Sequence, residues 1–287
     1  MAGGTGSKES LEYKDAYFTH PDDVEWCINQ LDKLYGIKGK TALEPAAGAN
    51  IFVKAAPQLK WTTNELYPEF AQGETHNYNL DFAKDDISTL GHFDFVIGNP
   101  PYGRNSMLAR KFVLRSLEVS DVVAMVVPKG LRRHTVWDKY FPDDCKVVFE
   151  ESLPNSTFNL PNGQVKTVGT FFLVLERVPG YSRGRLLDHE PKGYQMLETW
   201  NSKEELVAGA WPEWATHGIC QWGSAGKVFD RSHRGFARTI WLELTDEQAK
   251  IVEAADFEPL IERTKTSVPM LTRPEILTVI NRALANG

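Results

Sequence analysis

Short apolar runs alternate with amphipathic stretches along the chain as far as about residue 178. The runs are rich in β-branched residues and end in polar or turn-forming positions, a pattern typical of buried strands, whereas the stretch 108–117 has the apolar spacing of a helix. Strands that alternate with helices predict an α/β fold with a doubly wound parallel sheet. The predicted strands are 41–43, 61–66, 93–97, 122–127 and 147–151.

Two later segments predict how this sheet ends. The stretches 147–153 and 167–177 are apolar, and turn-forming residues at 154–156 and 161–163 separate them. This pattern predicts an antiparallel hairpin that closes the sheet. In sheets of this kind ligands bind beyond the carboxyl ends of the strands, so we expect the chemistry of the protein at those ends.

The regular alternation stops at a segment that is typical of a linker. Residues 179–184 contain proline, glycine and serine. The part that follows holds five of the eight tryptophans and ends in sequences that predict helices, with capping boxes beginning at Thr245 and Thr272. The sequence therefore predicts a disordered N-terminus at 1–14, an α/β domain at 15–178 and a small α+β domain at 179–287.

The predicted strand 93–97 leads into Asn99-Pro100-Pro101-Tyr102. A planar nitrogen has a delocalised lone pair, so an enzyme that methylates it must accept its hydrogens. Asn99 Oδ1 can accept one, and the Pro100 carbonyl, held by the rigid proline backbone, can accept the other. Tyr102 can stack on the ring that carries the nitrogen. The same four residues could instead form an ordinary turn at a strand end.

A second group of candidates follows the first predicted strand. Glu44, Pro45, Ala46, Gly48 and Asn50 lie in a tight turn between this strand and an apolar helix start. Gly48 permits close approach of the backbone, and a helix N-terminus attracts anionic or polar ligands. The turn therefore predicts a nucleotide-type ligand at this strand end.

Two further carboxylates extend this hypothesis. Glu65 ends the next predicted strand, where nucleotide-binding α/β domains place an acceptor for ribose hydroxyls, although it could also be a solvated loop residue. Asp81 beside Phe82 could clasp an adenine, or Asp81 could cap a helix.

In these motifs the chain resembles the S-adenosylmethionine-dependent amino methyltransferases that modify the exocyclic nitrogen of adenine in DNA. The segment 17–21, Tyr-Phe-Thr-His-Pro, resembles the N-terminal motif of that family, and residues 99–102 match its catalytic motif. The motif order is the γ arrangement, and the resemblance covers residues 15–178. The sequence departs from the family at Ala49-Asn50, where many members carry another glycine, and at His20 before the proline.

The resemblance implies a Rossmann-like methyltransferase domain at 15–178 and a target-recognition domain at 179–287. It implies S-adenosylmethionine as cofactor and an adenine flipped out of double-stranded DNA, sandwiched between Tyr102 and Phe158. The implied catalytic residues are Asn99, Pro100, Pro101, Tyr102 and Phe158. The implied cofactor-binding residues are Tyr17, Thr19, Glu44, Pro45, Ala46, Gly48, Asn50, Glu65, Asp81, Phe82 and Asn99.

Clustered basic residues predict where DNA phosphates would run, although solvated surfaces would explain them too. The net charge of −6 argues against indiscriminate binding to polyanions and leaves room for a local basic face. The predicted phosphate contacts after the strand ends are Arg104, Lys129, Arg132 and Arg133. Those interleaved with aromatics in the C-terminal part are Lys227, Arg231, Arg234 and Arg238.

Composition adds constraints without naming a substrate. Three dispersed cysteines and seven histidines show no metal-ligand spacing, so we expect no metal and a reducing, cytoplasmic environment. No apolar run has the length of a membrane span. The small C-terminal domain leaves room for a dimer or a helper subunit. Adenine in RNA, a protein glutamine, as in the release-factor methyltransferases, and a catalytically silent nucleic-acid-binding module remain alternative interpretations.

Overall fold

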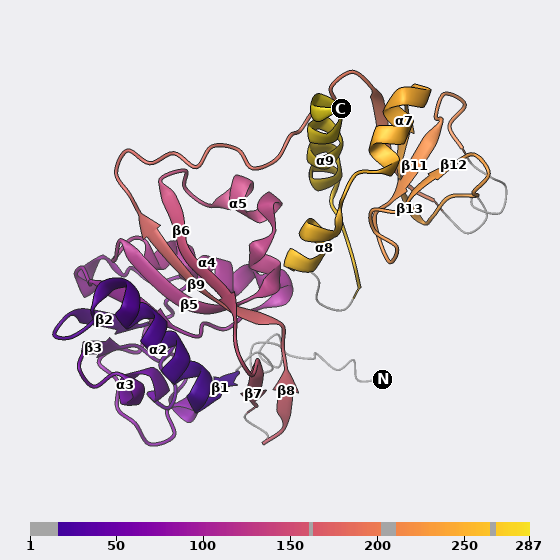
Figure 1. Cartoon of the computed structure of the whole chain (residues 1–287). Helices are drawn as coiled ribbons and strands as arrows, with labels where there is room; N and C mark the ends of the chain where they lie inside the picture. Colours follow the sequence, from indigo (N-terminus) through magenta and orange to yellow (C-terminus); the bar gives the residue numbers. More distant parts are fainter. Residues whose placement is uncertain (1–16, 161–162, 202–210, 265–267) are drawn as a thin grey trace, which may run out of the picture. The chain divides into compact units, whose positions relative to one another are not determined.

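The computed structural model describes residues 17–160, 163–201, 211–264 and 268–287. The chain divides into two compact units (Figure 1). The first combines the chain up to Leu131 with 142–183, and the second combines 132–141 with 184–287. The assignment of separate functions to 15–178 and 179–287 stays a prediction, and the N-terminus predicted to be disordered lies outside the described residues.

The first unit is built on a six-stranded mixed sheet with the order β3-β2-β4-β5-β9-β6. The pairs β2–β3, β2–β4 and β4–β5 are parallel, and β9 pairs antiparallel with both β5 and β6. The expected α/β class, with an antiparallel end to the sheet, is confirmed. The strands are β2 (Thr41–Glu44), β3 (Lys60–Thr63), β4 (Phe95–Gly98), β5 (Val122–Pro128), β6 (Cys145–Ser152) and β9 (Thr170–Arg177).

Helices cover both faces of this sheet. α2 (Pro21–Tyr35) and α3 (Ile51–Ala55) share one apolar cluster with β2, β4, β5 and β9. α4 (Met107–Ser116) packs on β5 and buries Phe112 and Val113. The short 3-10 helices of this part of the chain are η2 (Pro68–Phe70), η3 (Ser88–Leu90), η4 (Arg104–Ser106) and η5 (Lys129–Arg132). A single parallel bridge joins Tyr78 to Asn64, just beyond the end of β3.

A small second sheet joins the start of the described chain to the loop before β9. β1 (Phe18–Thr19) pairs antiparallel with β7 (Thr157–Asn159), which pairs with β8 (Val165–Thr167). The fully buried Asp23, in the first turn of α2, accepts hydrogen bonds from the backbone nitrogens of Asn155 and Ser156 at 3.0 and 3.2 Å. These bonds fix the loop that leads into β7.

The second unit contains a four-stranded antiparallel sheet with the order β10-β13-β11-β12. Both predicted capping boxes are present, at Thr245 of α7 and Thr272 of α9. The strands are β10 (Gln195–Trp200), β11 (His217–Cys220), β12 (Val228–Asp230) and β13 (Arg238–Glu243), and the helices are α5 (His134–Tyr140), α7 (Asp246–Glu253), α8 (Glu258–Thr264) and α9 (Arg273–Asn286).

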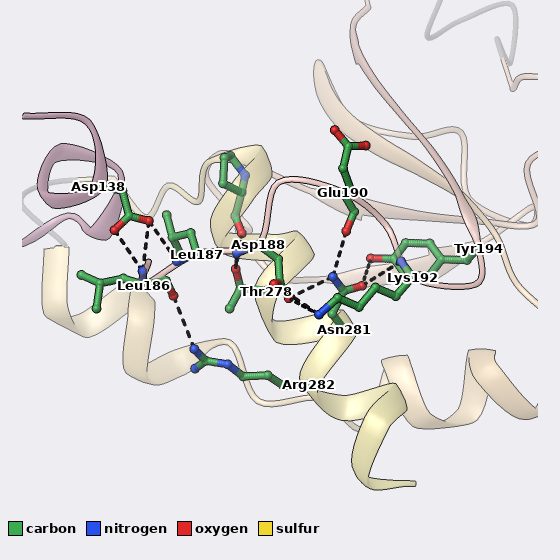
Figure 2. Close-up of polar contacts among 11 residues, drawn as sticks. Asp138, Leu186, Leu187, Asp188, Glu190, Lys192, Tyr194, Thr278, Asn281 and Arg282 are labelled. Carbon is green, nitrogen blue, oxygen red and sulfur yellow. Dashed lines mark hydrogen bonds and ion pairs between the residues drawn. The ribbon is translucent and has the colours of Figure 1, made fainter. Parts of the chain in front are cut away.

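Polar side chains of α5 and α9 hold the segment that precedes β10 (Figure 2). The Asp138 carboxylate of α5 accepts from the backbone nitrogens of Leu186 and Leu187, each at 3.0 Å. Asn281 of α9 donates to Asp188 Oδ2 and accepts from the Tyr194 hydroxyl, both at 3.0 Å. These contacts explain why α5 belongs to the second unit. None of the helices in the described ranges combines the length and apolar character needed to cross a membrane.

Candidate active site

The Glu44 turn and the Asn99 motif follow two neighbouring strands of the six-stranded sheet, β2 and β4. β2 ends at Glu44 and β4 ends at Gly98, and the two strands are parallel neighbours. A Cβ atom at Gly98 would lie 3.4 Å from Glu44 Cγ, so the two strand ends are in contact. Asn99 follows Gly98 directly. The expectation that the Glu44 turn and the Asn99 motif share one edge of the sheet is met by this geometry.

The Asn99 side chain is held by the start of the described chain. Its Nδ2 donates to the Tyr17 carbonyl oxygen at 2.8 Å and to Thr19 Oγ1 at 3.0 Å. Its Oδ1 is buried and has no hydrogen-bond partner among the residues that the structure describes. A buried acceptor without a donor is costly, and it is the feature expected of a site that receives a donor from a ligand.

Three aromatic rings surround this amide. The Tyr102 ring is 5% exposed and stacks on Tyr17, with ring centroids 5.1 Å apart and planes 20° apart. Phe158 meets Tyr102 edge-on at 85° and is itself buried. Burial is the main cause that raises the pKa of Tyr102 well above its ordinary value. Tyr17, and not Phe158, lies parallel to Tyr102, and the expected sandwich of an adenine between Tyr102 and Phe158 stays a prediction.

The start of α4 fixes the backbone of the motif. The Tyr102 carbonyl accepts hydrogen bonds from the backbone nitrogens of Leu108 and Ala109, at 3.1 and 3.2 Å. Gly103 has φ +66°, and a Cβ atom there would lie 2.8 Å from Leu108 Cβ. Only glycine fits this position without a shift. The expected roles of the Pro100 carbonyl and of Pro101 stay predictions.

Two buried carboxylates stand at the ends of β2 and β3. Glu65 accepts from the backbone nitrogen of Gly48 at 2.8 Å and from that of Tyr67 at 2.9 Å. Glu44 is 2% exposed, and its Oε2 has no hydrogen-bond partner among the described residues. Burial, and secondarily the charge of Glu65, raises the pKa of Glu44 well above its ordinary value. Burial also raises the pKa of Glu65.

The turn after β2 contains two residues with positive φ. Gly48 has φ +49°, and a Cβ atom at this position would lie 3.5 Å from the Phe18 ring. Asn50, at the N-terminus of α3, has φ 56°, and its buried Oδ1 has no partner in the described part of the chain. Non-glycine residues with positive φ concentrate at functional sites. Pro45 and Ala46 lie in the same turn.

Asn64 is a residue of this site that the sequence did not single out. It is 1% exposed, and its Nδ2 donates to the carbonyl oxygens of Pro45 and Leu80 at 3.0 and 3.1 Å. Its Oδ1 accepts from the Leu80 backbone nitrogen at 2.8 Å. Asn64 therefore ties the turn after β2 to the segment that leads to Asp81. Its place directly before Glu65, at a strand end, was the available signal.

The Asp81 pair is placed differently from the other candidates. The Asp81 carboxylate accepts from the Ala83 backbone nitrogen at 3.1 Å and pairs with Lys84 at 2.7 Å. Phe82 is 1% exposed and packs on Phe112. No helix directly follows Asp81 in the described range 17–160, so it does not cap one; its carboxylate instead stabilises a turn at 82–84, and the Phe82 ring packs in the core.

The predicted DNA-contacting residues fall into two groups. Arg133 pairs with the buried Glu275 at 3.4 Å, and Arg231 donates to the carbonyl oxygens of Ala215 and Pro212 at 2.9 and 3.1 Å. Both guanidinium groups thus support the fold of the second unit, and their expected contacts with DNA phosphates stay predictions. The Arg132 carbonyl accepts from Arg263, and Lys129 is half-buried beside Gly169. Arg104, Lys227, Arg231 and Arg234 are exposed, and Arg238 is half-buried.

Arg238 is stacked on an exposed tryptophan. Its guanidinium carbon lies 3.3 Å from the centre of the Trp200 ring, which is 68% exposed. In contrast, Trp241 is buried and packs on Trp211. The structure thus separates the tryptophans of the C-terminal part into core residues and surface residues. Within the described ranges, no group of three or more histidine, cysteine, aspartate or glutamate side chains is placed to hold a metal ion.

Comparisons with known proteins found similarity only among solved structures, at the level of the fold. No protein-family model matches the chain, and no curated protein sequence matches it. A putative RNA methyltransferase from Pyrococcus horikoshii is 18% identical, covering 62% of this chain and 94% of its own, with a TM-score of 0.47. A type I restriction-modification methyltransferase subunit from Streptococcus thermophilus is 17% identical over 59% of this chain, with a TM-score of 0.46. This chain covers 47% of that subunit.

A third structure of similar fold is a putative class I S-adenosylmethionine-dependent methyltransferase from Listeria monocytogenes. It is 13% identical, covers 60% of this chain and 62% of its own, and has a TM-score of 0.42.

Proposed function

We propose that the chain is an S-adenosylmethionine-dependent methyltransferase that modifies the exocyclic amino group of adenine in DNA. The observation that carries the proposal is the buried Oδ1 of Asn99, which has no hydrogen-bond partner among the described residues and lies next to the aromatic rings of Tyr102 and Tyr17. An amide oxygen in this place accepts a hydrogen from an amino group on a flat ring. The rings favour a purine over the carboxamide of a glutamine, because they offer stacking to an aromatic substrate.

The residues at the ends of β2 and β3 fit the proposed cofactor. Glu44 Oε2, which no described residue contacts by a hydrogen bond, is an acceptor for the charged methionine end, and the Gly48 turn allows close approach of the backbone. Each Glu65 oxygen retains acceptor capacity for a ribose hydroxyl beyond the backbone hydrogen bond it already accepts. Bound S-adenosylmethionine would supply an electrophilic methyl group. Glu44 ends β2 and Asn99 follows the end of the neighbouring strand β4, so the proposed cofactor contacts lie close to Asn99.

The residues around Asn99 would prepare the amino group for methylation. Asn99 Oδ1 accepts one amino hydrogen and the Pro100 carbonyl accepts the other, which raises the electron density on the nitrogen as charge develops. A base stacked on Tyr102 would take the place of the Tyr17 ring. Asn99 cannot serve as a base, so the extra proton leaves after transfer, to solvent. The amino group of a paired adenine is out of reach, so the base is flipped out of the duplex.

The second unit is our candidate for target recognition. The side chains that support this are Arg238 on the exposed Trp200, and the exposed Arg234 and Lys227. Cationic groups contact phosphates, and an exposed aromatic ring offers a stacking surface. A unit of this size leaves room for a second copy or a helper subunit in reading a DNA site.

The test is transfer of radiolabelled methyl groups from S-adenosylmethionine to unmethylated genomic DNA, bulk RNA and cell protein in parallel. We expect label in DNA as methyladenine, and none with Asn99→Ala. Asn29→Ala, at an exposed position of α2, is the matched control and should retain activity. Label in RNA or in glutamine would overturn the DNA substrate. Loss of cofactor binding in Asn99→Ala would overturn the assignment of this residue.

A further inference from the structure

The orientation of the Asn99 amide decides whether the proposed chemistry works. A carboxamide has an acceptor end and a donor end of nearly the same shape. An amino group that must lose its hydrogens to acceptors can be received only by the oxygen. If the amide were rotated by half a turn, the NH₂ group would face the substrate amino group, donor against donor.

The contacts of Asn99 determine which end faces the pocket. The Tyr17 carbonyl oxygen, 2.8 Å away, can only accept, so the atom that faces it must be Nδ2. Thr19 Oγ1, at 3.0 Å, takes the second hydrogen of the same nitrogen. Both amide donors are thereby used, and Oδ1 is left as a buried acceptor that no residue in the described ranges satisfies.

Thr19 is itself held firmly. It is 3% exposed, and β1 places it opposite Phe158 in the antiparallel pair with β7. The hydroxyl is the only polar group of its side chain, so valine, which has the same shape, would remove the acceptor without opening a cavity. The predicted contact of Thr19 with the cofactor would involve the same hydroxyl. Loss of a cofactor contact would raise the Kd for S-adenosylmethionine, whereas loss of a bond that orients Asn99 would lower kcat.

We infer that Thr19 is a positioning residue for the reaction: its hydroxyl, with the Tyr17 carbonyl, orients the Asn99 amide so that Oδ1 receives the substrate amino group. This inference rests on the proposed function. It goes further than that function, because it makes β1, through Thr19, responsible for discriminating a 6-amino purine from a 6-oxo purine. A rotated amide would offer a donor, which suits the oxygen of a 6-oxo purine and repels an amino group.

The test compares Thr19→Val with Thr19→Ser, which keeps the hydroxyl. Loss of one orienting hydrogen bond should lower kcat about three- to tenfold in Thr19→Val, with the Kd for S-adenosylmethionine unchanged. Inhibition of DNA methylation by deoxyadenosine and deoxyinosine monophosphates should shift toward deoxyinosine by a similar factor. Thr19→Ser should restore both values. Thr41→Val, which loses a hydroxyl bond to Asp94 at the opposite end of β2, should change neither.

The outcomes separate the inference from the function it rests on. An unchanged inhibitor ratio in Thr19→Val, or a Kd for S-adenosylmethionine that rises as kcat falls, would overturn the inference and leave the methyltransferase intact. A Thr19→Ser variant that behaves like Thr19→Val would also overturn it. Absence of methyl transfer by the wild-type chain to any nucleic acid would overturn the proposed function, and the inference with it.

Discussion

The amide nitrogen of Asn99 lies 2.8 Å from the carbonyl oxygen of Tyr17, which precedes it by 82 residues in the chain. This bond joins the end of β4 to the first described residue, and it requires a donor on Asn99. The same contact makes the conservative replacement Asn99→Asp an informative one, because an ionised carboxylate has nothing to donate.

Asn99→Asp should destabilise the protein in a pH-dependent way. A buried aspartate facing a carbonyl would have a raised pKa, so its protonated form, which can donate, persists above the ordinary range. The free energy of unfolding of the variant should therefore fall as pH rises, by about 1–3 kcal/mol relative to wild type at pH 8. Urea unfolding at pH 5 and pH 8 measures this. Equal stability of variant and wild type at pH 8 would contradict the hydrogen bond.

Glu44 should make the wild-type protein less stable as pH rises. Burial raises the pKa of Glu44 above 4.5, its ordinary value, so the folded state keeps the proton when the unfolded chain has lost it. Stability from this group is complete below pH 4.5 and is lost as pH rises through the raised folded-state pKa. Urea unfolding of Glu44→Gln between pH 5 and pH 8 should show a weaker pH dependence. The exposed Glu25→Gln should leave the slope unchanged, and an unchanged slope in Glu44→Gln would refute the assignment.

Local sequence was sufficient to predict the framework of the site. β2 and β4 could be recognised by their apolar runs, and in a parallel sheet neighbouring strands end at the same edge, so Glu44 and Asn99 had to meet. The capping box at Thr245 was also predictable, because its two hydrogen bonds join residues three positions apart.

Contacts between distant residues could not be predicted in this way. Arg133 pairs with Glu275, 142 positions away, and nothing near Arg133 in the sequence distinguishes it from a solvated arginine. The stacking of Tyr17 on Tyr102 likewise depends on the pairing of β1 with β7. Trp241 is buried between two buried neighbours in β13, so no alternation of polar and apolar residues separates it from the exposed Trp200.

Gly103→Ala should damage both stability and activity. A Cβ atom at Gly103 would lie 2.8 Å from Leu108 Cβ and 3.1 Å from the Leu108 backbone nitrogen, which donates to Tyr102. The positive φ and the clash together should cost about 2–4 kcal/mol of unfolding free energy. Gly39→Ala shares the positive φ, at +79°, but has open space around it, so it should cost about 1 kcal/mol and leave activity intact. Urea unfolding and methyl transfer measure the two effects. Similar losses in both variants would mean that the contact with Leu108 is not what demands glycine.

Alanine substitutions of Arg231 and Arg238 should have different effects, the first on stability and the second on DNA binding. Arg231 is held by backbone carbonyls, so Arg231→Ala should lower the unfolding free energy by about 1–3 kcal/mol and leave the salt dependence of DNA binding unchanged. Arg238 is stacked on the exposed Trp200, so Arg238→Ala should weaken binding and reduce the slope of log affinity against log salt by about 0.9. Fluorescence anisotropy with a random-sequence duplex over a range of NaCl concentrations measures this slope, and urea unfolding measures the stability.

Trp200→Ala completes this comparison. If Arg238 binds DNA from its stacked position, loss of the indole should weaken DNA binding with the salt slope retained, because the guanidinium loses its support and not its charge. A salt slope that is unchanged in Arg238→Ala but reduced in Arg231→Ala would reverse the assignment. It would mean that Arg231 breaks its hydrogen bonds to the carbonyl oxygens when DNA binds. The DNA backbone would then contact Arg231, and not Arg238 stacked on Trp200.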